Sequence, residues 1–106
     1  MINRRFGTPQ APLTSDVIIR FFATVRATFG QKEAVLRTDE ASTVGKALWR
    51  VCNTLERERG IFADSDRLRP DLIVLLNGRN IAFLGGLAAP LEKGDVVSVF
   101  PPVKGG

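Results

Sequence analysis

Few side chains in this sequence could carry out chemistry by themselves. The 106 residues include no histidine and a single cysteine, Cys52. Without histidine, the chain lacks the usual general base, the commonest metal ligand and the usual proton switch near neutral pH. Zinc sites and nucleophiles that depend on a neighbouring histidine are excluded for the same reason. We therefore expect no metal site, no bound cofactor and no stand-alone enzyme.

The acidic residues are also poorly placed for catalysis. Asp64 and Asp66 fall in a polar stretch that predicts a loop. Asp39 and Glu40 precede a predicted helix, where acidic side chains favour the helix dipole. No pair of carboxylates lies on a predicted cleft, so general acid–base work by such a pair is not expected.

The group best suited to chemistry is the α-carboxylate of Gly106. The last eleven residues read V-V-S-V-F-P-P-V-K-G-G. Gly105 and Gly106 lack a Cβ, so this end can thread a narrow channel and approach a nucleotide closely. Pro101 and Pro102 cannot donate to a β-ladder, so the strand before them must end and the chain must leave the sheet. We call residues 101–106 the tail: Pro101, Pro102, Val103, Lys104, Gly105 and Gly106.

The tail needs a folded body behind it, and the apolar pattern predicts one. Alternating β-branched and aromatic residues predict a first strand at Val17–Ala23. Its apolar face comprises Val17, Ile19 and Phe21, and its other face comprises Ile18, Arg20 and Phe22. Further strands are predicted at Glu33–Thr38, Leu72–Leu76, about Asn80–Phe83 and Val96–Phe100, with a two-residue turn at Asn77–Gly78.

One helix is predicted, over Thr43 to about Arg59. Its apolar residues recur three and four positions apart, which predicts one buried stripe. Ser42 or Thr43 can cap its start, and Gly60 can end it. Cys52 lies on the stripe, which favours a small buried side chain over a reactive thiol.

The remaining segments are predicted to be irregular. Met1–Asp16 reads as a flexible extension, and Val17–Gly106 as one domain. A connection of about nine residues joins the first two strands. Ile61–Pro70 is polar and predicts a loop.

The order β-β-α-β-β-β predicts an α+β fold. One main helix must bury its stripe against one face of a mixed sheet of four to five strands. Parallel pairing of the first and last strands at the sheet centre gives both strands neighbours. This is the ubiquitin-like β-grasp arrangement.

Five segments together resemble a known family: V-I-I-R-F-F-A, A-S-T-V-G-K-A-L, L-L-N-G-R-N-I, L-E-K-G-D-V-V and F-P-P-V-K-G-G. They are similar to the MoaD/ThiS sulfur carriers, and most similar to the small subunit of molybdopterin synthase, of the ubiquitin-like small modifier type. The resemblance covers about Val17 to Gly106. Many relatives have Ala or Ser where this chain has Lys104, which places a charge where the tail enters a partner.

The resemblance implies a chemical role for Gly106. An E1-like enzyme would adenylate its carboxylate at the expense of ATP, and a sulfur donor such as a cysteine desulfurase or rhodanese would convert it to a thiocarboxylate. The large subunit of molybdopterin synthase would then use that sulfur to build the dithiolene of molybdopterin. The carrier itself would be non-catalytic.

Two other functions remain open. The chain could be a protein modifier joined to lysines, or a sulfur carrier for tRNA thiolation or thiamine, because all of these use the same activated tail. It could also be a non-covalent β-grasp binding module, for which the tail would be dispensable.

Candidate partner-binding residues lie near the predicted root of the tail. Phe100, Ile18 and Phe22 could share the sheet face opposite the helix and form an apolar docking patch. The alternative is that loops cover these side chains. Arg79, with Arg20 and Lys104, could add charge complementarity to an acidic partner.

Composition argues against nucleic acid and membrane partners. The net charge is +4, but basic and acidic residues alternate, as in E-R-E-R at residues 56–59, which is typical of a solvated face. No apolar run approaches the length of a membrane span, and no signal peptide is recognisable. The single cysteine fits a reducing cytoplasm.

Overall fold

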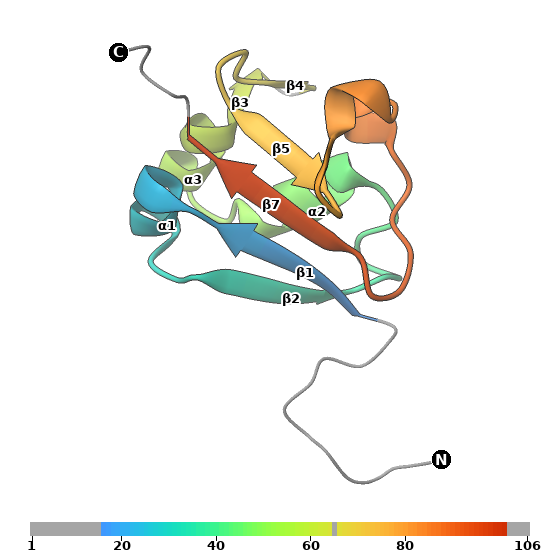
Figure 1. Ribbon diagram of the computed structural model, residues 1–106. Coiled ribbons are helices and arrows are strands. Elements are labelled where there is room, and N and C mark those ends of the chain that lie inside the picture. The colour runs from blue at the N-terminus through green and yellow to red at the C-terminus, as the bar shows by residue number, and fades with distance from the viewer. Residues whose placement is uncertain (1–15, 65, 102–106) are drawn as a thin grey trace, which may run out of the picture.

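A mixed five-stranded sheet forms the body of the computed structural model, which describes residues 16–64 and 66–101 (Figure 1). The strand order is β2-β1-β7-β5-β6. β1 and β7 run parallel at the centre, and the other pairs are antiparallel. The parallel central pair confirms the β-grasp prediction. The strands are β1 (Asp16–Phe21), β2 (Glu33–Arg37), β5 (Ile73–Leu76), β6 (Arg79–Asn80) and β7 (Val96–Phe100).

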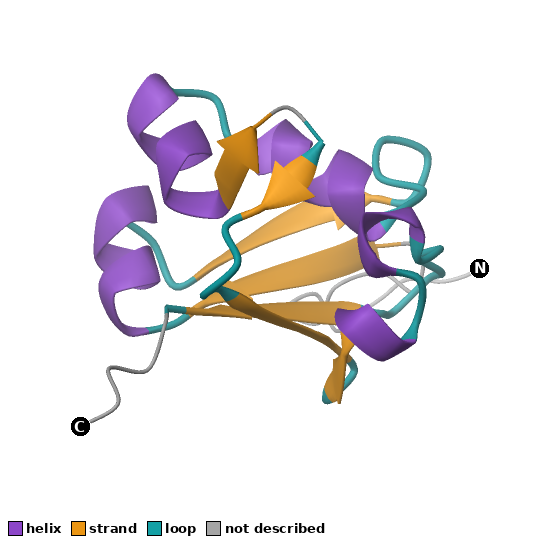
Figure 2. Ribbon diagram, turned by 90° about the horizontal axis from the view of Figure 1, so that it is seen from above, coloured by secondary structure: helices purple, strands orange, loops and turns teal. Residues whose placement is uncertain are grey.

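The core lies on one side of this sheet, where the helices pack (Figure 2). The inward side chains of β1 are fully buried, as their alternation predicts: Val17, Ile19 and Phe21. The predicted extension, residues 1–16, lies outside the described residues except for Asp16, which begins β1. None of the helices in the described ranges combines the length and the apolar composition that a membrane span requires.

The single helix expected over Thr43–Arg59 is wrong, because two helices occupy this segment. α2 (Val44–Val51) and α3 (Leu55–Ile61) are separated at residues 52–54. The Thr54 side chain accepts a hydrogen bond from the Arg57 amide at 3.2 Å and so caps a new helix. Thr43 caps α2 as expected, but Gly60 lies inside α3 and does not end it.

A further helix replaces the expected connection between the first two strands. α1 (Ala23–Phe29) follows β1 directly and ends at Gly30, whose φ is 71°. Its start has no side-chain cap, and Ala23 has a φ of 53°. Tertiary packing stabilises it instead: the Phe29 ring stacks on Phe21 at 4.2 Å.

The predicted loop at Ile61–Pro70 is instead a small hairpin. β3 (Phe62–Asp64) pairs with β4 (Arg67–Leu68). Ile61 and Phe62 are buried, and the Phe62 ring stacks on Trp49 at 4.2 Å. Because most of this segment is polar, its sequence did not indicate that Ile61 and Phe62 belong to the core.

The turn at Asn77–Gly78 is confirmed, and both residues have a positive φ. The expected strand at Asn80–Phe83 is shorter, because β6 ends at Asn80. The Asn80 side chain accepts a hydrogen bond from the Ala82 amide at 2.9 Å and starts the 3-10 helix η1 (Ile81–Phe83). A second 3-10 helix, η2 (Gly86–Ala88), follows.

Candidate functional site

The strand that leads to the tail lies between two others in the sheet. β7 has β1 on one side and β5 on the other (Figure 1). Its inward side chains, Val97 and Val99, are fully buried. Phe100 ends the strand, and Pro101 is half-buried beside it. The root of the tail is therefore held in place by a strand that is paired on both sides.

The proposed reactive group itself lies outside the described residues. The same holds for most of the predicted tail residues: Pro102, Val103, Lys104, Gly105 and Gly106. The structure therefore bears on how the tail is held at its root.

Two aromatic rings stack beside this root. The Phe22 and Phe100 ring centroids lie 4.3 Å apart with an interplanar angle of 9°. Their strands are joined at this point, because the Phe22 amide donates a hydrogen bond to the Val99 carbonyl at 3.1 Å. Both rings are half-exposed. The ring stack thus presents an apolar surface one residue before the tail.

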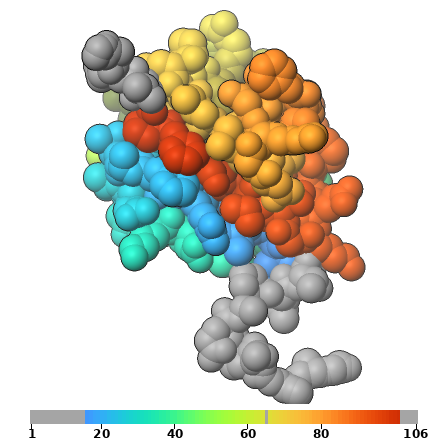
Figure 3. Space-filling view, viewed as in Figure 1, coloured from blue at the N-terminus to red at the C-terminus, as the bar shows by residue number. Residues whose placement is uncertain are grey.

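Ile18 lies on the same face, further from the tail. It pairs with Val96, at the start of β7, and is half-buried. Register adds two residues that sequence reasoning missed, because Ile73 pairs with Phe100 and Leu75 with Ser98, and cross-strand partners share a face. We call this set the outer patch: Ile18, Phe22, Ile73, Leu75, Val96 and Phe100. The face that carries it is seen in Figure 3, where β7 runs between β1 and β5.

Arg79 is not brought to the root of the tail. It pairs with Leu76, whose partner in β7 is Val97, so it lies level with the start of β7. Leu76 points into the core, so Arg79 is on the opposite face of the sheet from the outer patch. Arg20 does share the face of the outer patch, where it forms an ion pair with Glu33 at 3.5 Å.

A cavity of about 250 Å³ opens beside Pro101. Val25 and Phe29 of α1 and Leu72 give it apolar walls, and Arg69 contributes a cation. Arg69 forms an exposed ion pair with Asp71 at 3.5 Å. No pattern in the sequence indicates this cavity, because its walls come from segments far apart in the chain.

Cys52 is buried, which confirms the prediction of a small core side chain. Burial raises the pKa of its thiol to about 12, with a further contribution from Glu58. A thiol with so high a pKa stays protonated and is a poor nucleophile at neutral pH. Within the described residues, no group of three or more Cys, Asp or Glu side chains could hold a metal ion.

Comparisons with known proteins give consistent results. The model of the ThiS family matches residues 19–106, which include β7 and the whole tail. The small archaeal modifier protein 3 of Haloferax volcanii is 42% identical over 91 residues, which cover 86% of this chain and 99% of that protein.

Solved structures show the same likeness. The small archaeal modifier protein 1 of Methanosarcina acetivorans aligns with a TM-score of 0.74 at 28% identity, over 87% of this chain and 97% of that one. A putative molybdopterin converting factor, subunit 1, of Pyrococcus furiosus aligns with a TM-score of 0.62 at 27% identity, over 83% of this chain and 98% of that one.

Proposed function

Because the chain belongs to the ThiS family of ubiquitin-like sulfur carriers, we propose that it is a carrier of the modifier type, activated at Gly106. Carriers of this family are not catalysts, so the chemistry belongs to partner enzymes. The observation that carries the proposal is the identity to a small archaeal modifier protein along nearly all of that protein's length. The two proposed fates of the activated tail are a thiocarboxylate and an amide bond to a lysine.

The chemistry starts from a carboxylate, which is a poor acylating group because its leaving group would be oxide. A Gly106 oxygen attacks the α-phosphorus of ATP, pyrophosphate leaves, and an acyl adenylate forms. A persulfide of the sulfur donor then attacks the carbonyl carbon and releases AMP, which gives an acyl disulfide. A second thiol attacks the donor's own sulfur in that S–S bond, so the thiocarboxylate leaves and a disulfide remains on the donor. Attack by a lysine amine on the activated carbonyl gives an amide instead.

The chain's own contribution is presentation. β7 fixes the root of the tail, and Pro101 ends the ladder because it has no amide hydrogen. The outer patch supplies an apolar surface next to that root. We propose that the E1-like activating enzyme docks on the ring stack of Phe22 and Phe100 while the tail enters its nucleotide site. We place these ATP-dependent steps in the cytoplasm. The single cysteine, which is buried, is consistent with that reducing compartment.

A role as the small subunit of molybdopterin synthase is the second candidate. It is favoured by the likeness to the Pyrococcus furiosus molybdopterin converting factor subunit, at lower identity than the modifier protein. In that role the thiocarboxylate sulfur goes to molybdopterin through the synthase large subunit.

Mass spectrometry can test the proposal and separate the two candidates. The chain is incubated with ATP, the E1-like enzyme of its host and a sulfur donor, and the carboxyl-terminal peptide is analysed for replacement of one oxygen by sulfur. Conjugates are sought in host extracts after trypsin digestion. Trypsin cleaves after Lys104, so a conjugate leaves Gly105–Gly106 on the modified lysine.

A matched control lacks Gly105 and Gly106. Remnants that appear only with the native chain support a modifier, whereas a thiocarboxylate without remnants favours a dedicated sulfur carrier. Neither product with the native chain would contradict both candidates and leave the non-covalent binding module.

A further inference from the structure

One edge of the sheet is open along a full strand. β2 pairs with β1 on one side, and no described residue pairs with its other side. The other edge strand, β6, has only two residues, whereas β2 has five. An open edge strand of this length is a template for pairing with another chain.

The register shows which backbone groups point outward from this edge. The Phe21 amide donates to the Lys32 carbonyl at 2.8 Å, so these two residues form a hydrogen-bonded pair of the β1–β2 ladder. Since such pairs alternate in an antiparallel ladder, Ala34 and Leu36 bond to β1, and the backbone groups of Glu33, Val35 and Arg37 face away.

These outward groups are largely unused within the described ranges. The carbonyls of Glu33 and Arg37 each accept one local hydrogen bond, from the Gln31 side chain at 2.8 Å and the Glu40 amide at 2.9 Å. A carbonyl has a second acceptor site. The backbone of Val35 bonds to no other described residue, and its side chain is 51% exposed.

The sequence of this strand is complementary to itself in the antiparallel direction. β2 reads E-A-V-L-R. When two copies pair about Val35, each Glu33 faces Arg37 of the other copy, and each Ala34 faces Leu36. Opposite charges and apolar side chains thus meet directly across the junction, which is the favourable arrangement for cross-strand pairs.

We propose that the partner of this edge is a second copy of the chain, paired antiparallel through β2 about a two-fold axis at Val35. The two five-stranded sheets then form one continuous sheet. In the strand order, β1 separates β2 from β7, so each tail root lies two strands away from the junction (Figure 1). The pairing therefore leaves both tails accessible to partner enzymes.

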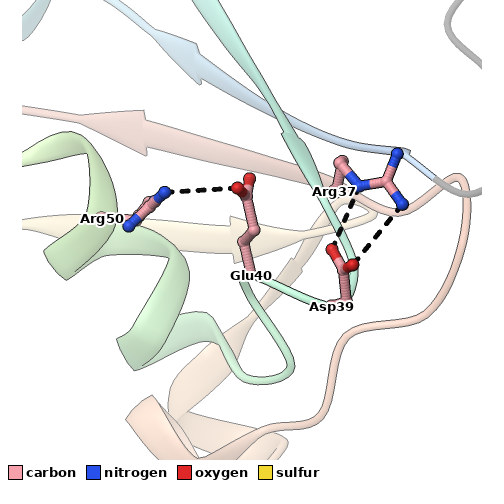
Figure 4. Close-up of polar contacts among 4 residues, drawn as sticks. All are labelled: Arg37, Asp39, Glu40 and Arg50. Carbon is pink, nitrogen blue, oxygen red and sulfur yellow. Dashed lines mark hydrogen bonds and ion pairs between the residues drawn. The ribbon is translucent and has the colours of Figure 1, made fainter.

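The charges at this edge already have exposed partners within one chain. The Arg37 Nε atom donates to the Asp39 Oδ1 atom at 3.2 Å (Figure 4), and Glu33 forms an ion pair with Arg20 at 3.5 Å. Exposed ion pairs contribute little stability, so exchanging them disturbs the fold little. Across the junction they act mainly on specificity, by favouring this register over others.

Substitutions that reverse the charges of Glu33 and Arg37 test the proposal. Sedimentation of the native full-length chain is expected to give a mass that rises with concentration from 11.6 kDa toward twice that value. Arg37→Glu places two like-charged pairs at the junction and is expected to abolish the rise. The double variant Glu33→Arg/Arg37→Glu restores opposite charges and is expected to restore it. Lys46→Glu, an exposed change on α2 with the same charge difference as Arg37→Glu, is the control and should leave the rise intact.

Amide hydrogen exchange locates the contact. Pairing through β2 predicts that the Val35 amide becomes protected as concentration rises, while the Ala34 and Leu36 amides are protected throughout. A constant monomer mass would overturn the proposal, as would a rise that Arg37→Glu leaves unchanged. Protection of Val35 at every concentration with a monomer mass would also overturn it, because residues 1–15 of the same chain would then cover the edge. None of these readouts depends on Gly106, so the failure of one proposal does not decide the other.

Discussion

Phe100 is the residue that we propose to contribute most to docking beside the tail. Its ring stacks on Phe22 and lies one residue before Pro101. Phe100→Ala is expected to lower the affinity for the activating enzyme about tenfold, which corresponds to about 1.4 kcal/mol. Loss of the ring stack should cost about 1 kcal/mol of folding stability, so the fold persists. Titration calorimetry measures the affinity, and chemical denaturation measures the stability.

A second phenylalanine provides the control for this variant. Phe83 lies in η1 and is 87% exposed, outside the outer patch. Phe83→Ala should leave the affinity for the enzyme unchanged. Equal effects of the two substitutions would show that the outer patch is not the docking site.

Cys52 gives a prediction for pH dependence. Its folded pKa is raised to about 12 from an ordinary value of 9.0. The folded state therefore holds its proton while the unfolded state loses it, and stability falls as pH rises above about 9 and levels off only above the folded pKa. The difference in unfolding free energy between the native chain and Cys52→Ala should shrink over that range. Denaturation of both proteins at several pH values measures it, and a constant difference would contradict the assigned burial.

At the scale of elements, Thr54 decides where α3 begins. Its side chain accepts a hydrogen bond from the Arg57 amide, which has no backbone acceptor in the first turn of the helix. Thr54→Ala should lower the free energy of unfolding by about 1 kcal/mol. Guanidinium denaturation measures the loss. Thr54→Ser keeps a hydroxyl acceptor and should lose much less, so equal losses would argue against a capping role.

Local sequence patterns predicted most of the strands but few of the helix boundaries. Periodicity predicted β1, β2, β5 and β7 closely, because alternating apolar residues report burial directly. It merged α2 and α3, because Cys52 and Leu55 continue the apolar spacing across the break. Only the side chains of Asn53 and Thr54 mark that break, and a capping residue also occurs inside helices.

α1 was missed for a different physical reason. Its start has no polar cap, and Ala23 adopts a backbone conformation that alanine rarely adopts. The helix depends on contacts distant in sequence: Arg57 of α3 donates to the Phe29 carbonyl at 2.7 Å and lies over the Phe29 ring at 5.0 Å. Tertiary contacts of this kind override weak local preferences.

For the candidate site, the sequence predicted the root of the tail and three residues of the outer patch, Ile18, Phe22 and Phe100. Ile73 and Leu75 were missed because L-I-V-L-L at residues 72–76 reads as buried on both faces, whereas the helices pack mainly on one side of the sheet (Figure 2). Arg79 was grouped with the tail by composition alone, and its pairing with Leu76 places it elsewhere. Register thus determines which residues share a face, and a single sequence does not fix register.

At the scale of the whole molecule, the fold separates two surfaces. The central strand β7 leads to the tail, and the edge strand β2 offers a complementary junction for a second copy. Such a dimer would carry two tails, and each tail would keep its own outer patch beside its root. Activation and self-association can therefore be altered independently, by changes at Phe100 and at Arg37.

The proposed function requires Gly106 to be the group that an activating enzyme modifies. The most direct measurement is ATP–pyrophosphate exchange by the host's E1-like enzyme in the presence of the chain. The native chain is expected to stimulate exchange, and the chain without Gly105 and Gly106 is expected to give none while retaining its fold. Equal exchange with the truncated chain, or none with the native chain, would contradict the proposed function.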